Sequence, residues 1–307
     1  MESLLPATGD VMDLSGVVAV DKPTGLTSRQ IVDKVAKIVR PAKAGHAGTL
    51  DPLATGVLVV AIGCATRLIS YIQQGRKRYI GRFELGKRSD TDDSEGQIRD
   101  GGDWSGITRD QLDEAIAEFI GVIHQVPPQF SAVHVDGQRA YALARRGQTV
   151  DLQARPVEVF SVRVTQFAPP EFELELECGS GTYVRSIGRD LGEQLGCGAI
   201  MTSLRRLTVG PFSVENAVPY DNLDVATLRA ALQPPVQAIA DLPRRNVDDN
   251  EAKALRQGKV IGLGPVPFPE SANEAALIDL DNRLIGVARI EAALQRLQPH
   301  IIFPVKK

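Results

Sequence analysis

Residues 45–58 read Gly-His-Ala-Gly-Thr-Leu-Asp-Pro-Leu-Ala-Thr-Gly-Val-Leu, and the interpretation of the chain starts from this segment. It runs into an apolar stretch, 57–62, whose length and composition predict a buried strand. Asp51 stands before that strand, and Pro52 confines the Asp51 backbone to extended conformations. A lone Asp-Pro pair is usually only a turn. Here the rigid loop would hold a carboxylate beside a strand end, as a nucleophile or general base requires.

Two glycines and a histidine surround this carboxylate. Gly48 and Gly56 permit positive φ angles or a close approach of another backbone. A single histidine is usually structural, but His46 precedes Asp51 in the same glycine-rich loop and is a candidate to face a ligand. The segment is therefore a candidate catalytic loop.

The charges around this loop are unevenly distributed. The whole chain has a formal net charge of −3, yet residues 22–88 carry 13 Lys and Arg against three acidic residues. Residues 89–118, in contrast, carry 10 acidic residues against two Arg. Charge asymmetry alone usually reflects solvated faces. Because the Asp51 loop lies inside the basic part, that part becomes a candidate surface for nucleic acid.

The periodicity of the chain mixes helices and strands. A capping box of Thr27 and Gln30 opens a helix that Pro41 ends, and a second capped helix is expected at 108–120. Strict alternation over 172–178 gives one buried and one wet face, which suits an antiparallel sheet. The other expected elements are strands at 16–20, 79–85 and 157–167 and a helix from about Thr182. Without βαβ regularity, this order predicts an α+β fold.

The C-terminal part has a different pattern. Pro234-Pro235 and Pro243-Arg-Arg are typical of a linker. Beyond it, short β-like runs separated by Gly, Pro and Asn predict a small β-rich module; they lie at 259–263, 275–280 and 284–289.

Composition narrows the class of protein. At 307 residues the chain is long enough for two domains and a buried core, which excludes a disordered or disulfide-stapled protein. Its three cysteines form no C-x-x-C pair, which indicates a reducing compartment. No apolar run approaches the roughly 20 residues of a membrane span, and no signal peptide is recognisable. We therefore expect a cytoplasmic protein that does not enter a membrane.

Phosphate-loop and zinc motifs do not fit. Gly81–Arg88 matches G-x-x-x-x-G-K, but Arg88 stands where Ser or Thr binds magnesium, and the interior alternates like a strand. The four histidines form neither H-E-x-x-H nor the H-x-E pattern of zinc deaminases. The sequence therefore supports neither a phosphate-binding loop nor a zinc site of these two kinds.

A further cluster at 181–192 contains Tyr183 and Arg185. Arg185 would lie near a helix N-terminus, where the helix dipole disfavours a cation, so we expect a carboxylate or phosphate partner for it. Tyr183 is as compatible with the core as with a site.

Taken together, the motifs resemble the TruB family of bacterial tRNA pseudouridine synthases. The segments that carry the resemblance are 21–28, 45–58, 77–79 and 181–192, extended by 127–141 and 204–207. They cover roughly residues 15–215. A weaker similarity at 255–259 matches the start of the family's PUA-like tail.

The resemblance implies a reaction and an architecture. The family isomerises uridine 55 in the T loop of tRNA by base flipping, without cofactor or metal. The implied pseudouridine synthase fold has a mixed, largely antiparallel sheet flanked by helices. The catalytic domain would span 1–240, with a thumb-like insertion at about 124–152, and a PUA-like RNA-binding module would span 245–307. We expect a monomer that binds the T stem-loop and whose tail is dispensable for chemistry.

The resemblance also implies residue roles. Asp51 would be the nucleophile, attacking either the uracil ring or ribose C1′, and Arg185 would be its ion-pair partner. Tyr79 would stack on the base and accept the C5 proton. Substrate-binding roles fall on Lys22, His46, Tyr183 and Leu204, and RNA-backbone contacts on Lys43, Arg76, Arg139, Arg145 and Arg146.

Two other classes of protein remain open from the residues themselves. A non-catalytic tRNA-binding or chaperone protein would use the basic region and the tail, and its tRNA binding would survive without chemistry. A glycoside hydrolase would use Asp51 at an anomeric carbon but needs a second carboxylate about 5–9.5 Å away. The basic surroundings of Asp51 predict none. The acidic stretch at 90–95 has no explanation at this level.

Overall fold

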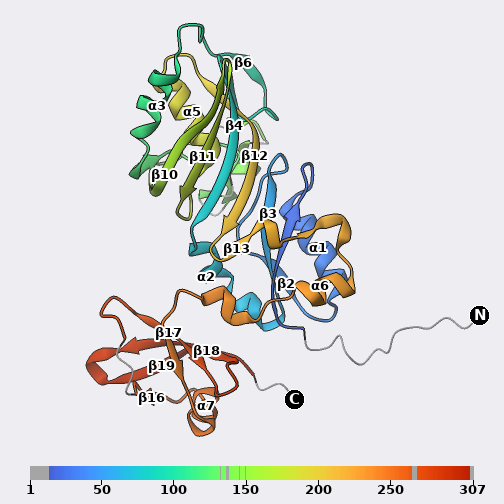
Figure 1. The fold of residues 1–307 in the computed structure, drawn as a ribbon, viewed down its shortest axis with the longest axis vertical. Coiled ribbons are helices and arrows are strands. Elements are labelled where there is room, and N and C mark those ends of the chain that lie inside the picture. The colour runs from blue at the N-terminus through green and yellow to red at the C-terminus, as the bar shows by residue number, and fades with distance from the viewer. Residues whose placement is uncertain are drawn as a thin grey trace, which may run out of the picture.

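The computed structural model describes residues 14–131, 133–135, 138–144, 146–148, 150–264 and 268–304. They form an elongated molecule in which a ten-stranded sheet is followed by a five-stranded sheet at the C-terminal end (Figure 1). No helix in these ranges is long and apolar enough to cross a bilayer.

The large sheet is mixed. Its strands are β1 (Gly16–Lys22), β2 (Ala44–His46), β3 (Thr55–Ile62), β4 (Lys77–Leu85), β7 (Gly121–Gln125), β10 (Arg155–Ala168), β11 (Glu171–Cys178), β12 (Ala199–Val209), β13 (Phe212–Ser213) and β14 (Val218–Pro219). Their order is β14-β1-β3-β12-β4-β11-β10-β7, with β2 beside β3 and β13 beside β12. The β1–β14 and β3–β12 pairs are parallel and the others antiparallel. The predicted α+β class is confirmed.

The helices that accompany this sheet were predicted in part, after the capping residues Thr27 and Thr108 and from about Thr182. They are α1 (Ser28–Ile38), α2 (Ile69–Gln74), α3 (Arg109–Ala117), α4 (Ala140–Ala144), α5 (Val184–Gln194) and α6 (Val225–Ala231). The predicted capping boxes at Thr27 and Thr108 are both present. Two boundaries differ from expectation, because α3 ends at Ala117 and α5 begins at Val184, with Tyr183 as its N-cap. Short 3-10 helices lie at Gly63–Leu68, Val214–Asn216, Tyr220–Asn222, Pro235–Ile239 and Ala292–Leu294.

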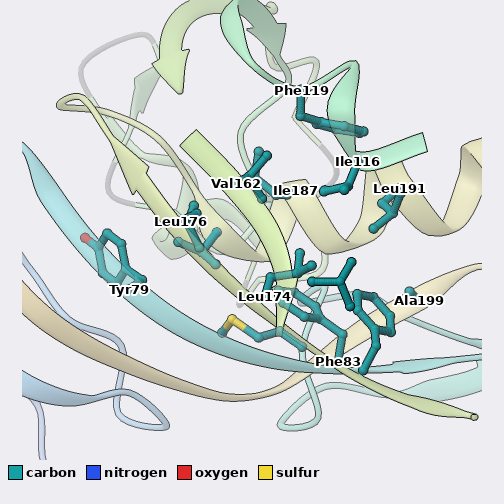
Figure 2. Close-up of a cluster of buried hydrophobic side chains, with 14 of the residues drawn as sticks. Tyr79, Phe83, Ile116, Phe119, Val162, Leu174, Leu176, Ile187, Leu191 and Ala199 are labelled. Carbon is teal, nitrogen blue, oxygen red and sulfur yellow. The ribbon is translucent and has the colours of Figure 1, made fainter. Parts of the chain in front are cut away.

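The core has two main parts along the sheet. In one, α3 and α5 pack on β4, β10 and β11, with Phe83 stacked on Phe172 at 5.1 Å between ring centroids (Figure 2). In the other, the β1–β3 half is buried on both faces, by α1 and α6 on one side and by α2 and the 3-10 helices on the other. Tyr79 lies at the edge of the first part (Figure 2), toward the middle of the sheet.

The C-terminal sheet contains the predicted β-like runs and more. Its strands are β15 (Arg244–Asn246), β16 (Ile261–Gly262), β17 (Glu274–Ile278), β18 (Leu284–Glu291) and β19 (Arg296–Ile302), in the order β15-β17-β18-β19-β16, with helix α7 at Asp249–Arg256. The β19 strand and α7 were not predicted from the sequence.

The segment expected to be a linker is ordered and packed. Val236 and Ile239 are buried, and they belong to one apolar cluster that also contains Leu68, Ile278 and Phe303. The two sheets therefore share a hydrophobic core. Polar contacts also join them, since Arg67 Nη1 donates to the Ile302 carbonyl at 2.7 Å and the Tyr71 hydroxyl donates to Glu274 at 2.8 Å.

Candidate active site

The loop at residues 47–54, called the Asp51 loop below, lies between β2 and β3 and is held by the 21–28 motif. The Ser28 hydroxyl accepts the Leu50 N–H at 2.8 Å and donates to the Leu50 carbonyl at 3.0 Å. Lys22 Nζ donates to the Pro52 carbonyl at 3.2 Å. The motif therefore fixes the backbone on both sides of Asp51.

Two glycines are required where this loop meets the sheet. Gly48 and Gly56 both have positive φ angles, of 101° and 97°. A Cβ on Gly56 would lie 2.2 Å from the carbonyl oxygen of Arg206 on the neighbouring β12. Any larger residue there would displace β12 from β3. This matches the close approach expected from the sequence.

Arg185, in the first turn of α5, binds two carboxylates. Its Nε lies 3.0 Å from Oδ2 of Asp51, and its Nη1 lies 3.3 Å from Oδ2 of Asp93. The carbonyls of Thr91 and Phe130 accept from the same guanidinium at 2.7 and 3.1 Å. The Arg185 and Asp93 side chains are only 6% and 4% exposed. Arg185 therefore has the kind of partner that its position at a helix N-terminus predicts.

The ionisation of Asp51 depends on this guanidinium. Burial raises the pKa of Asp51 above its ordinary value, Arg185 lowers it, and the nearby Asp93 raises it again. The Asp51 side chain is still 35% exposed, so one edge of the carboxylate can be reached from outside. Arg185 thus favours the ionised form of a carboxylate that is both rigid and accessible.

The acidic stretch has a structural explanation. It forms the connection between β5 (Lys87–Ser89) and β6 (Ile98–Asp100). Within it, Asp93 binds Arg185, and Asp92 Oδ2 lies 2.8 Å from Nη1 of Arg189, one turn further along α5. The stretch supplies counter-charges to two arginines of one helix.

This arrangement corrects one expectation. A second carboxylate does lie near Asp51, because Asp93 shares Arg185 with it. The charge of Glu95, an exposed residue, also interacts with that of Asp51. The absence of a neighbouring carboxylate was inferred from the basic composition of 22–88, and the acidic partners come from beyond that range.

Tyr79 and Leu204 lie on adjacent strands and belong to the same apolar cluster as Leu50 of the Asp51 loop. Tyr79, on β4, is the cross-strand partner of Arg206 on β12, and Leu204 is the partner of Gly81. Burial raises the pKa of Tyr79, whereas the positive charge of Arg206 lowers it. Arg206 itself was not singled out from the sequence, because β12 was not predicted.

His46 directly precedes the Asp51 loop on β2, and Tyr183 is the N-cap of the helix that carries Arg185. His46 lies on β2, where burial and the charge of Arg206 lower its pKa and favour the neutral imidazole. Its Nδ1 is buried without a hydrogen-bond partner among the described residues. The charges of Arg185 and Asp51 both act on Tyr183, and its N–H donates to Gln125 Oε1 at 2.8 Å.

Lys22 does not have the environment expected of a substrate or phosphate ligand. Its side chain is fully buried, and its ammonium also donates to the carbonyls of Pro23 and Leu26, at 2.9 and 2.6 Å. Burial lowers the pKa of Lys22 to about 8. A phosphate cannot reach a group that three backbone carbonyls already enclose.

Among the described residues, none of the cations predicted to bind the RNA backbone forms an ion pair with Asp51. Arg76 stacks over Phe160 at 3.8 Å and pairs with Glu177 at 3.5 Å. Lys43 is exposed before β2, and Arg146 is exposed after α4. Arg139 lies on β9 (Gln138–Arg139), which pairs with β8 (His134–Val135), but the structure describes only its backbone. Arg145 lies outside the described residues.

The basic charge of 22–88 is partly neutralised in place. The polar face of β11 presents Glu173 and Glu175, which are largely buried, to arginines of β4, in the pairs Arg82–Glu173 at 3.0 Å and Arg78–Glu175 at 2.6 Å. The charge count therefore overstates the number of cations free to meet RNA. In the part of the chain that the structure describes, no three His, Cys, Asp or Glu side chains converge as metal ligands.

Comparison with known proteins identifies the family. Residues 36–184 match the N-terminal domain of the TruB family pseudouridylate synthases, and residues 185–240 match the tRNA pseudouridylate synthase B C-terminal domain. The chain belongs to the TruB family. The family predicted from the motifs is thereby confirmed, and with it the prediction of an enzyme.

Whole-chain relatives agree with the family match. A tRNA pseudouridine synthase B of Synechococcus sp. (strain CC9311) is 38% identical over 298 residues, covering 95% of this chain and 98% of the relative. Another, of Sinorhizobium medicae (strain WSM419), is 41% identical over 293 residues, covering 90% of this chain and 92% of the relative. Among solved structures, a Cbf5-Nop10-Gar1 complex contains a chain with a TM-score of 0.70 and 26% identity, covering 95% of this chain and 84% of that chain. This similarity confirms the pseudouridine synthase fold for the TruB-family protein described here.

Proposed function

We propose that this protein isomerises uridine to pseudouridine at position 55 in the T loop of tRNA, with Asp51 as the nucleophile. The observation that carries the proposal is the Asp51–Arg185 pair, in which a buried guanidinium holds an accessible carboxylate at 3.0 Å. The names of the relatives support tRNA as the substrate. The resemblance of the motifs supports position 55.

The chemistry requires one exchange of bonds. The N1–C1′ bond breaks, a C5–C1′ bond forms, and the proton that leaves C5 is balanced by one that N1 gains. Asp51 attacks the uracil ring or ribose C1′ and is released when the new bond has formed. Arg185 favours the ionised form of Asp51 before the attack and fixes its direction.

The surrounding side chains bind a flipped base. A uridine inside a folded loop must leave the stack to reach Asp51, at a cost of a few kcal/mol. Tyr79 stacks on the extruded ring, and its oxygen accepts the C5 proton. Tyr183 and Leu204 line the pocket, and neutral His46 fills the space that the base leaves in the RNA.

The rest of the chain binds the tRNA body. We assign catalysis to residues 1–240, including the insertion at about 124–152, and RNA docking to a PUA-like module at 245–307. Lys43, Arg76, Arg139, Arg145 and Arg146 contact the RNA backbone. Lys22 instead supports the Asp51 loop through its hydrogen bond to Pro52.

The experiment is incubation of the full chain with an unmodified tRNA transcript, followed by chemical mapping of pseudouridine. A transcript with cytidine at position 55 is the matched control. We expect one new pseudouridine, at position 55, and none in the control. Modification at another position would refute the site, and release of free uracil would indicate a hydrolase. Binding without any chemical change would indicate an RNA-binding protein.

A further inference from the structure

Arg206 occupies the centre of the sheet beneath the site. It lies on β12 between β3 and β4, and it is only 2% exposed. Its Nε donates to the Val57 carbonyl at 2.7 Å, and its Nη2 donates to the Gly48 carbonyl at 3.2 Å. One side chain therefore joins the Asp51 loop to β3, while its backbone pairs with Tyr79 on β4.

In the part of the chain that the structure describes, this guanidinium has no counter-charge. Among the described residues, no carboxylate oxygen lies within 4.0 Å of it, and its hydrogen bonds go to the Val57 and Gly48 carbonyls and to the Tyr79 side chain. A buried cation without an ion pair is destabilising, so its presence calls for a role other than stability.

The group that this charge meets is the Tyr79 phenol. The ionisable groups that act on Tyr79 are Arg206 from β12, Cys178 from β11 and Asp51 from its loop. Burial, Cys178 and Asp51 all disfavour the phenolate, whereas Arg206 favours it through its charge and a side-chain hydrogen bond. Arg206 is thus the neighbour suited to stabilise negative charge on this oxygen.

We propose that Arg206 is a positioning residue for Tyr79, holding its oxygen in place and stabilising the phenolate during proton transfer at C5. The inference rests on the proposed function. In that step the C5–H bond breaks, its electron pair returns to the uracil ring, and the proton goes to the Tyr79 oxygen. The phenol's own proton goes to N1 of the detached base, so Tyr79 is unchanged at the end of the cycle.

The planar shape of the side chain suits this role. The guanidinium has five N–H donors in a fixed fork, which can satisfy two carbonyls and a phenol oxygen together. A lysine at the same position would keep the charge but lose the fork. Arg206→Lys should therefore be an intermediate variant and Arg206→Gln a severe one.

The test is the isotope effect at C5 in single-turnover reactions on tRNA transcribed with 5-deuterouridine or ordinary uridine. General acid–base groups contribute about 10²–10⁴-fold to a rate, so Arg206→Gln should slow the reaction at least about ten-fold. It should also increase the C5 isotope effect above the wild-type value. Arg206→Lys should recover part of the rate. Arg205→Gln is the matched control, because Arg205 is on the same strand but pairs with Asp21 at 2.9 Å.

A loss of rate without a larger isotope effect would overturn the proposal, because it would place Arg206 in loop or strand stability alone. An unchanged rate would also overturn it. If melting curves show that Arg206→Gln does not fold, Arg206→Lys tests the proposal instead, because its C5 isotope effect must likewise exceed that of wild type. Failure of the proposed function is distinguishable, because then the wild-type protein itself would form no pseudouridine.

Discussion

Removal of Arg185 should separate its structural role from its catalytic role. In Arg185→Gln, Asp93 keeps its charge in a site where it is only 4% exposed, with no cation left beside it. At the observed 3.3 Å and an effective dielectric constant of about 20, the lost attraction is about 5 kcal/mol. Breaking a buried pair from one side typically costs about 3–5 kcal/mol. We therefore expect Arg185→Gln to lose that amount of stability in urea unfolding.

The double variant Arg185→Gln, Asp93→Asn should recover most of this stability. Two neutral amides need no charge compensation, and replacing a whole buried ion pair is often neutral. Activity should nevertheless stay low at pH 7, because burial raises the pKa of Asp51 and Arg185 no longer opposes it. Since a higher pH ionises more Asp51, single-turnover rates of the double variant should increase from pH 6 to pH 9 more steeply than those of wild type.

A matched control lies one helical turn away. Arg189 and Asp92 form a similar pair at 2.8 Å, but Arg189 does not contact Asp51. The double variant Arg189→Gln, Asp92→Asn should keep its activity at pH 7. The reasoning is refuted if the Arg185 double variant is as unstable as the single variant, or if it turns over tRNA at the wild-type rate.

Three further outcomes follow from the same contacts. Burial raises the folded-state pKa of Asp51 above its unfolded value of 3.8, so the stability linked to Asp51 falls as pH rises through the folded pKa. The melting temperature of Asp51→Asn should therefore equal or exceed that of wild type at pH 8. The difference between the two melting temperatures should close toward pH 4. Tyr79→Phe should bind tRNA but not complete the reaction, and wild-type turnover would reduce Tyr79 to a stacking platform. Phe303 lies in the core that both sheets share, so Phe303→Ala should lower the unfolding free energy by about 3–5 kcal/mol. The variant should still unfold in one cooperative transition. A separate early transition would show that the sheets unfold independently.

Local features of the fold could be predicted from the sequence. The capping box of Thr27 and Gln30 involves residues three apart, so its pattern alone places the start of α1. The Asp51 loop is similar, because Pro52 restricts the backbone and the glycines permit positive φ angles at known positions. An anionic partner for Arg185 could be predicted, because a cation at a helix N-terminus lacks favourable dipole interactions and calls for an anion.

Features that depend on strand order could not be predicted in this way. Arg206 acquires its role because β12 inserts between β3 and β4, and the charged pair Arg205-Arg206 hides the apolar alternation of that strand. Lys22 counts as a surface cation in any charge sum, yet the folded 21–28 motif encloses it in backbone carbonyls. Asp93 belongs to an acidic run that is typical of a solvated loop, and it is buried because α5 presents Arg185 to it.

The most direct test of the central claim compares Asp51→Asn with Asp90→Asn on unmodified tRNA. Asp90 is exposed and accepts the Gln97 N–H at 2.7 Å, so it controls for the same change of charge in the neighbouring acidic segment. We expect Asp51→Asn to form no pseudouridine at position 55 while its tRNA affinity stays within a few fold of wild type, and Asp90→Asn to react normally. Turnover by Asp51→Asn above a few per cent of the wild-type rate, in a preparation free of wild-type enzyme, would contradict the account.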